Sequence, residues 1–317
     1  MTTDAHESSL PDGADALAAA IRAEVGKAFI GQEDVLDAVM IALLAGGHVL
    51  LEGVPGLGKT LLVRALSQAL GCAHARVQFT PDLMPSDISG HAVFDPKQER
   101  FEIRRGPVFT NLLLADEINR APAKTQSALL EAMQEQQVTI EGNSFPLPPP
   151  FMCLATQNPL ELEGTYPLPE AQLDRFLLKV LIGYPSLVDE KRMVAAVSEG
   201  RTAADFDLSQ VAQVADPAAV LMLQRRAAAV RVDAAVLDYA VRIVAATRAW
   251  PGIALVRAAR AQAMLEGRDF VVPDDVRGIA KPALRHRIAL APELQIEGQS
   301  ADDVLHALLA KVDAPRQ

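Results

Sequence analysis

The first half of the chain alternates short apolar runs with stretches of helical periodicity. Four apolar runs lie at residues 48–51, 110–115, 151–155 and 177–182, and a helical pattern over residues 61–70 follows the first of them. Short buried strands that alternate with helices are typical of a parallel sheet. The pattern therefore predicts an α/β fold with a parallel sheet, and we assign residues 1–185 to this domain.

After residue 185 the strand pattern stops and the chain becomes helical. Asp233 is placed to cap a helix that carries a single apolar stripe, formed by Val236, Tyr239, Ala240, Ile243 and Val244. Further helices are expected at residues 254–266, 273–280 and 301–312. Residues 186–317 are therefore predicted to form a small, all-helical lid domain.

Two segments of the first domain alternate around turn-forming residues. One spans residues 89–105 with its turn at Asp95-Pro-Lys-Gln, and the other spans residues 137–147 with its turn at Glu141-Gly-Asn. Both patterns predict β-hairpins.

A complete phosphate-binding loop lies between the first apolar run and the first helix. Its residues are Gly53, Val54, Pro55, Gly56, Leu57, Gly58, Lys59 and Thr60, with Leu61 next in the chain. The glycines let backbone N–H groups turn toward phosphate oxygens, Lys59 reaches the β/γ-phosphates, and the Thr60 hydroxyl can ligate Mg²⁺. The helix that begins near Lys59 also directs its positive end at the anion. A Gly-rich turn in another kind of α/β protein is the alternative, but the flanking strand and helix favour a nucleotide site.

Two adjacent carboxylates, Asp116 and Glu117, end the second apolar run in the manner of a Walker B element. Consecutive residues at a strand end project differently, so Asp116 can organise Mg²⁺ through water while Glu117 polarises the attacking water. Taken alone, such a pair is more typical of a solvated helix cap. Its position one βαβ interval after the phosphate loop favours an ATPase.

Two further polar residues follow from the same strand pattern. Asn158 ends the third run before Pro159 and is expected beside the phosphate loop, because parallel strands end at one edge of the sheet. Its amide can orient the lytic water or contact the γ-phosphate, unless the pair is only an Asn-Pro turn. Arg175 ends a short helix far from its own phosphate loop and can serve a neighbouring subunit as a finger. The alternative is an ordinary cation at a helix C-terminus.

Five strings, in this order and spacing, resemble the AAA+ ATPases and more closely the MoxR family. They are IGQ at 30–32, the phosphate loop at 53–60, ADEINRAP at 115–122, ATQNP at 155–159 and EGTYPLPEAQLDRF at 163–176. The resemblance extends from about residue 20 to the end of the chain. It implies a P-loop AAA+ αβα sandwich with hairpin insertions, followed by a helical lid that closes over the nucleotide.

The resemblance also implies roles for single residues. By it, Lys59 and Thr60 bind nucleotide and Mg²⁺, Asp116 and Glu117 are the Walker B pair, Asn158 is sensor 1, Arg175 is the arginine finger, and Ile30 and Gln32 line the adenine pocket. The two hairpins would project toward the pore of a ring as substrate-handling or coupling elements. Inert surface hairpins are the alternative.

The chain departs from the family pattern at one place. MoxR-like proteins usually carry a Gly-x-x-Pro-Arg string with the sensor 2 arginine, whereas this chain reads as though a loop had been excised between Gly252 and Ile253. Either the protein lacks this sensor or the sequence omits these residues. No sensor 2 residue is assigned, and Arg257 and Arg260 are interpreted as solvated or lid-packing helix cations.

Composition narrows the classes of function. A net charge of −10 disfavours generic binding to nucleic-acid phosphates, although the cluster of Arg100, Arg104 and Arg105 leaves a local basic groove open. No apolar stretch reaches the ~18 residues of a membrane span. The acidic start of the chain is wrong for a secretory signal, and two cysteines, Cys72 and Cys153, suggest the reducing cytoplasm.

The sequence therefore predicts an ATP-hydrolysing, Mg²⁺-dependent AAA+ ring ATPase of MoxR type, with a homo-hexamer as the expected ring. The resemblance implies a chaperone-like role in remodelling or maturing a protein client, often with a partner that bears a von Willebrand factor A domain. One alternative is a magnesium-chelatase-type motor subunit for metal insertion. A nucleic-acid-dependent AAA+ motor is disfavoured by the acidic charge, and a scaffold that hydrolyses little is disfavoured by Glu117 and Asn158.

Overall fold

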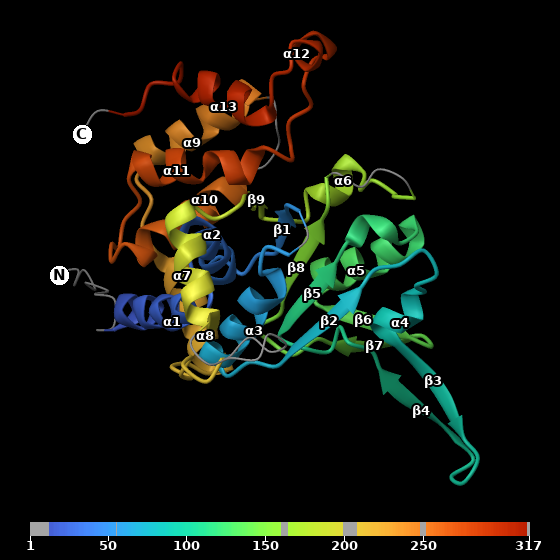
Figure 1. Ribbon diagram of the computed structural model, residues 1–317. Helices are drawn as coiled ribbons and strands as arrows, with labels where there is room; N and C mark the ends of the chain where they lie inside the picture. Colours follow the sequence, from blue (N-terminus) through green and yellow to red (C-terminus); the bar gives the residue numbers. More distant parts are fainter. Residues whose placement is uncertain (1–12, 55, 160–163, 199–207, 248–251, 316–317) are drawn as a thin grey trace, which may run out of the picture.

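The computed structural model describes residues 13–54, 56–159, 164–198, 208–247 and 252–315. Figure 1 shows a central sheet with helices packed around it and a group of helices from the end of the chain stacked beside it. None of the helices in these described ranges is long and apolar enough to cross a membrane.

A five-stranded sheet forms the centre of the fold. Its order is β2-β5-β8-β1-β9, and each pair of neighbours runs parallel. The strands are β1 (Val49–Glu52), β2 (His74–Gln78), β5 (Leu112–Asp116), β8 (Met152–Gln157) and β9 (Leu178–Leu181). The four predicted strands are confirmed to within two residues at each end. The pattern did not reveal β2, because Val77 alone among its residues is buried.

Alternate residues of the strands supply two separate cores. Val49 and Leu51 of β1 pack with the first three helices, whereas Leu50 packs on the opposite face with α5. The helices on the first face are α1 (Ala14–Ala28), α2 (Glu33–Leu44) and α3 (Lys59–Leu70), and those on the second are α4 (Pro85–Ser89) and α5 (Ala123–Glu135). A sheet that is buried on both faces matches the predicted αβα sandwich.

Both predicted hairpins are confirmed. The first pairs β3 (Gly90–Asp95) with β4 (Arg100–Arg105), and the second pairs β6 (Gln137–Ile140) with β7 (Asn143–Pro146). Figure 1 shows the β3–β4 hairpin extending well beyond the body of the protein. An exposed edge-to-face pair of rings, Phe94 and Phe101, lies on it.

The second half of the chain is helical, as predicted. Between β8 and β9 lies the short α6 (Glu170–Leu173), and after β9 come α7 (Leu187–Ser198), α8 (Pro217–Ala229), α9 (Ala234–Thr247), α10 (Gly252–Leu265), α11 (Pro273–Leu284), α12 (Pro292–Ile296) and α13 (Ala301–Leu309). Asp233 caps α9 by accepting from the Ala235 N–H at 2.8 Å, and the predicted apolar stripe is buried.

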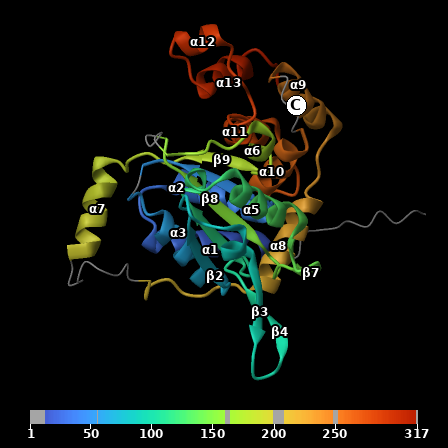
Figure 2. The same ribbon diagram turned by 90° about the vertical axis from the view of Figure 1, so that its right-hand side faces the viewer.

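Two lid helices end at other residues than predicted. The helix α11 continues past Pro282, because the buried Ala283 and Leu284 outweigh the N–H that proline lacks. The helix α13 stops at Leu309, three residues early. Figure 2 shows α7 well apart from the other helices of this half. The helices α8 and α10 of the second half pack against α2 of the first half and share its core. Packing therefore does not separate the two halves at residue 185, and the domain boundary there remains a prediction.

His48 fixes the start of β1 against its neighbours. Its Nδ1 accepts from the Cys153 N–H of β8 at 3.0 Å, so Nε2 carries the proton and donates to the Met133 carbonyl of α5 at 3.1 Å. Burial is the main reason that the pKa of His48 falls to about 4. The folded protein therefore requires the neutral form of His48, which anchors the start of the strand that leads into the phosphate loop.

Because the pKa of His48 is depressed on folding, its contribution to stability is complete above about pH 6.5 and is lost as the pH falls toward 4. Within that window each pH unit should remove up to about 1.4 kcal/mol from the free energy of unfolding. His48→Gln should flatten the pH dependence measured by urea unfolding. An unchanged slope in the variant would show that His48 is not the titrating group.

Candidate nucleotide-binding site

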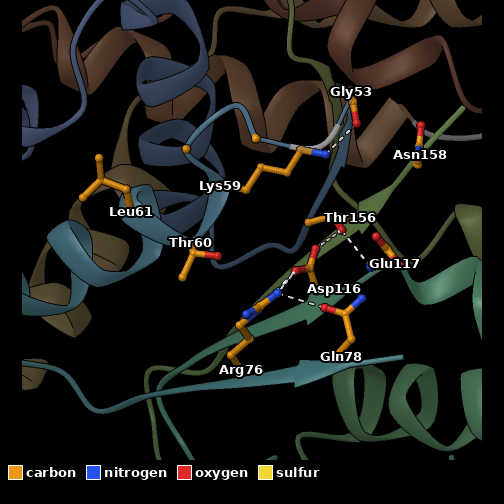
Figure 3. Close-up of a pocket in the computed structure, with 12 residues that line it drawn as sticks. Gly53, Lys59, Thr60, Leu61, Arg76, Gln78, Asp116, Glu117, Thr156 and Asn158 are labelled. Carbon is orange, nitrogen blue, oxygen red and sulfur yellow. Dashed lines mark hydrogen bonds and ion pairs between the residues drawn. The ribbon is translucent and has the colours of Figure 1, made fainter. Parts of the chain in front are cut away.

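A pocket lies where the carboxyl ends of the parallel strands meet, and Figure 3 shows the side chains that converge on it. They come from the loop after β1, from the start of α3 and from the ends of β2, β5 and β8. The lining residues are Gly53, Gly56, Gly58, Lys59, Thr60, Leu61, Arg76, Gln78, Asp116, Glu117, Thr156 and Asn158.

The backbone of the loop shows why glycines occupy it. Gly56 and Gly58 have φ values of 87° and 76°, in the left-handed region that disfavours other residues. A side chain on Gly53 would place its Cβ 2.5 Å from the Ile182 carbonyl oxygen, so the close approach of the ends of β1 and β9 requires glycine there. Pro55 of the predicted loop lies outside the described residues.

Lys59 points back across the loop, and its Nζ donates to the Gly53 carbonyl at 2.7 Å. Burial lowers the pKa of Lys59, while Asp116, Glu117 and Glu52 act in the opposite direction. A cation that is partly stripped of water and held by a single carbonyl suits an anionic ligand, because phosphate oxygens would replace the missing hydration.

Asp116 at the end of β5 is held from two sides. Thr156 of β8 donates its hydroxyl to Asp116 Oδ1 at 2.6 Å, and Arg76 of β2 donates to Oδ2 through Nη2 at 2.6 Å and Nε at 3.2 Å. The same Thr156 hydroxyl accepts from the Glu117 N–H at 2.8 Å. One buried hydroxyl therefore positions both carboxylate residues.

Glu117 has a left-handed backbone, with φ 56° and ψ 50°. For a residue other than glycine this conformation carries strain, which is common at functional sites. Its Oε2 lies 3.2 Å from Nε of Arg120 in the short helix η1 (Ile118–Arg120), whereas the carboxylate of Asp116 is bonded by Arg76. The two acids thus project differently, as the sequence predicted.

Asn158 is buried at the end of β8 and lines the same pocket. Ile30, Gln32, Val54 and Leu57 do not line it, but the Phe29 ring lies against Gly58 and so places residues 30–32 next to the loop. The Oε1 atom of Gln32 is buried, and the described residues supply it with no hydrogen-bond partner. An open acceptor of this kind suits the amino group of adenine.

Arg175 lies at the opposite edge of the sheet. It lines a second cavity with Gly46, Gly47 and His48, which precede β1, whereas the phosphate loop follows β1. The strand between them is roughly 13 Å long at about 3.3 Å per residue. Arg175 therefore cannot reach the phosphate pocket of its own chain, and its Nη1 donates to the Leu130 carbonyl and to Gln134.

The arginines near the missing sensor 2 string also lie away from the phosphate pocket. Arg257 Nη2 donates to the Ala45 and Gly46 carbonyls after α2, so it holds α10 of the lid against that helix. Neither Arg257 nor Arg260 lines the phosphate pocket. This position agrees with their interpretation as lid-packing cations.

The sequence pattern did not predict three of the residues that line the pocket. Arg76 and Gln78 lie on β2, whose lack of an apolar run hid the strand, although their spacing of two residues places both side chains on one face. Thr156 immediately precedes the Gln157-Asn158 end of β8 and was counted only as part of the strand.

Comparison with known proteins places this geometry in a family. Residues 48–178 match the model of the ATPase family associated with various cellular activities, and residues 240–308 match the AAA lid domain. Chaperone MoxR1 of Mycobacterium tuberculosis is 42% identical over 98% of this chain and 87% of its own. The chain belongs to the MoxR family of AAA+ ATPases. Protein MoxR of Methylorubrum extorquens is 32% identical over 98% of both chains.

A solved structure agrees with this assignment. A protein from Cytophaga hutchinsonii superposes on this MoxR-family chain with a TM-score of 0.88, at 40% identity and with 96% of both chains covered. The predicted fold, an α/β AAA+ domain followed by a helical lid, is thereby confirmed.

The residues present fit the nucleotide and the metal that the family implies. Lys59 and the backbone of the glycine loop offer donors to phosphate oxygens, and the Thr60 hydroxyl and the Asp116 carboxylate are the oxygen ligands that Mg²⁺ prefers. Their shared pocket lies at the N-terminus of the 12-residue helix α3.

We expect Thr156→Val to cost about 1–3 kcal/mol of unfolding free energy, because the part-buried Glu117 N–H loses its acceptor. Thr156→Ser keeps the hydroxyl and is the matched control. Urea unfolding of the three proteins measures the difference. Equal losses in the Val and Ser variants would assign the effect to packing and not to the hydroxyl.

Proposed function

We propose that this MoxR-family protein binds ATP with Mg²⁺ at the carboxyl edge of its sheet and hydrolyses it. The observation that carries the proposal is the convergence of Lys59, Asp116, Glu117 and Asn158, from three separate segments, on one pocket. A glycine-rich turn without a role in nucleotide binding would not be expected to face two carboxylates and a buried amide.

Each side chain has a task in this proposal. Lys59 and the N-terminus of α3 hold the β/γ-phosphates, while Thr60 and Asp116 hold Mg²⁺, which neutralises charge on the phosphates when bound. Glu117 accepts the proton of the attacking water, and Asn158 orients that water or the γ-phosphate. Ile30 and Gln32 contact the adenine.

Arg175 is proposed to act on the nucleotide of a neighbouring subunit. Its position at the amino-terminal edge of the sheet supports this role, because contact between opposite edges of two copies would bring Arg175 of one to the phosphates of the other. Such head-to-tail contacts form a ring when the rotation between neighbouring copies closes. We propose a homo-hexamer in the cytoplasm that remodels a protein client, with a von Willebrand factor A partner.

The other two functions are less well supported. The name of one relative, Chaperone MoxR1, favours a chaperone-like role over a magnesium-chelatase-type motor. The net charge of −10 argues against a nucleic-acid-dependent motor. Clients can be sought by pull-down with a Glu117→Gln protein that retains ATP, and ATPase stimulation by DNA would instead support the nucleic-acid motor.

Lys59→Ala and Glu117→Gln should separate binding from turnover. Lys59→Ala removes the cation at the phosphates and should abolish binding of a fluorescent ATP analogue. Glu117→Gln should bind the nucleotide normally but lower the hydrolysis rate by roughly 10²–10⁴-fold, because the water loses its base. Normal affinity in the first variant, or normal turnover in the second, would refute the corresponding role.

Arg175→Ala should bind ATP normally and hydrolyse it roughly 10³–10⁵-fold more slowly, because a finger stabilises charge that develops in the transition state. Arg225→Ala, which removes an exposed arginine of α8, is the control and should keep full activity.

Mixing the Arg175→Ala and Glu117→Gln proteins should restore some activity, since mixed rings contain interfaces with an intact Glu117 facing an intact Arg175. Native mass spectrometry can confirm that mixed rings form. Mixed rings without activity would show that Arg175 does not act across subunits.

A further inference from the structure

Arg76 is a cation in the phosphate pocket that the phosphate-binding loop does not account for. It comes from β2, its side chain is 51% exposed, and it faces the pocket beside Asp116. Besides its two bonds to Asp116, its Nη2 donates to Gln78 Oε1 at 2.9 Å. Its guanidinium is therefore held by two acceptors on the same edge of the sheet.

The bonds of Arg76 use up one oxygen of Asp116. A carboxylate oxygen has two lone pairs, and Oδ2 already accepts from both Nη2 and Nε of Arg76. The other oxygen, Oδ1, accepts from the Thr156 hydroxyl and keeps one free site. A metal-bound water that bonds to Asp116 must therefore displace Arg76 from Oδ2 or share Oδ1 with the Thr156 hydroxyl.

Displacing Arg76 from Oδ2 is the easier of these two routes. The buried Thr156 hydroxyl is held on both sides, since it donates to Oδ1 and accepts from the Glu117 N–H, so it has little freedom to shift and make room for a second bond at Oδ1. Arg76 is half-exposed and keeps Gln78 and solvent as alternative partners. Exposed ion pairs are weak, whereas a divalent ion bound with phosphates is the strongest local charge in such a site.

We propose that Arg76 competes with Mg²⁺ for Asp116: it neutralises the carboxylate in the nucleotide-free site and is released when the metal and nucleotide bind. This inference rests on the proposed function. Arg76 is thus a positioning residue that sets the metal concentration at which the site is loaded, and its released side chain stays in the pocket next to the phosphates.

The substitution Arg76→Ala distinguishes two roles for Arg76, competition with the metal and orientation of Asp116 for the metal. The two roles predict opposite changes in the metal concentration at half-saturation. If Arg76 competes, Arg76→Ala frees Oδ2 and lowers the metal concentration needed for half-saturation by roughly two- to five-fold, the range expected for losing an exposed ion pair. If Arg76 only orients Asp116 for the metal, the half-saturation concentration rises. Arg76→Lys keeps the charge without the paired donors and should lie between wild type and Arg76→Ala.

The measurement is Mn²⁺ binding to the full-length, ADP-loaded protein, followed by electron paramagnetic resonance as the metal is titrated. Arg231→Ala is the matched control, because it removes an exposed arginine from an ion pair with Asp269 outside the pocket. It should leave the midpoint unchanged. Nucleotide affinity measured in EDTA should not rise in Arg76→Ala, since the gain depends on the metal.

The outcomes are distinct. A lower Mn²⁺ midpoint in Arg76→Ala, with equal thermal stability, supports competition. An unchanged or higher midpoint overturns it while leaving the ATP site intact. A wild-type protein that binds no nucleotide with or without metal contradicts the proposed function itself.

Discussion

The parallel direction of all five strands is the constraint on which the rest of the structure depends. Each strand contributes its carboxyl end to one edge, so residues as distant in the chain as Lys59 and Asn158 share a pocket. The apolar interior of the sheet keeps these ends in register, because shifting a strand by one residue would exchange its two buried faces. The two cores therefore set the positions of the strand ends, and the hydrogen bonds of Thr156 and Arg76 then orient the side chains of the site.

Gathering polar groups at one edge has an electrostatic cost, and the pocket offsets it with paired charges. Asp116 and Glu117 are adjacent acids, yet each faces a different arginine, Arg76 and Arg120. Lys59, whose pKa burial depresses, lies between the loop carbonyl and these acids. The charged groups of the site are therefore paired with one another, and a charged ligand would compete with these pairs.

The sequence was most informative where an apolar run ended in a polar residue. The phosphate loop, Asp116, Glu117 and Asn158 were all found in this way, because buried strands leave a clear pattern and the chemistry follows at their ends. Arg76 and Gln78 were missed because β2 has one buried residue and no such pattern. Thr156 was missed because a threonine in a strand has an ordinary role in packing, and only its two hydrogen bonds reveal another. Which side chains meet across neighbouring strands depends on the order of the strands in the sheet. A local sequence pattern does not contain this order.

The opposite edge of the sheet completes the argument for action between subunits. Arg175 shares its cavity with two further arginines, Arg257 of the lid and Arg287, which is tied to Asp174 at 2.7 Å. Three guanidinium groups near one carboxylate leave this edge positive, whereas the triphosphate proposed for the carboxyl edge is negative. Two copies that met edge to edge would therefore attract each other through opposite charges on different surfaces, which is the kind of heterologous contact that the proposed ring needs. The lid takes part in this face through Arg257, so a lid that moved with nucleotide would also move the surface offered to the next subunit.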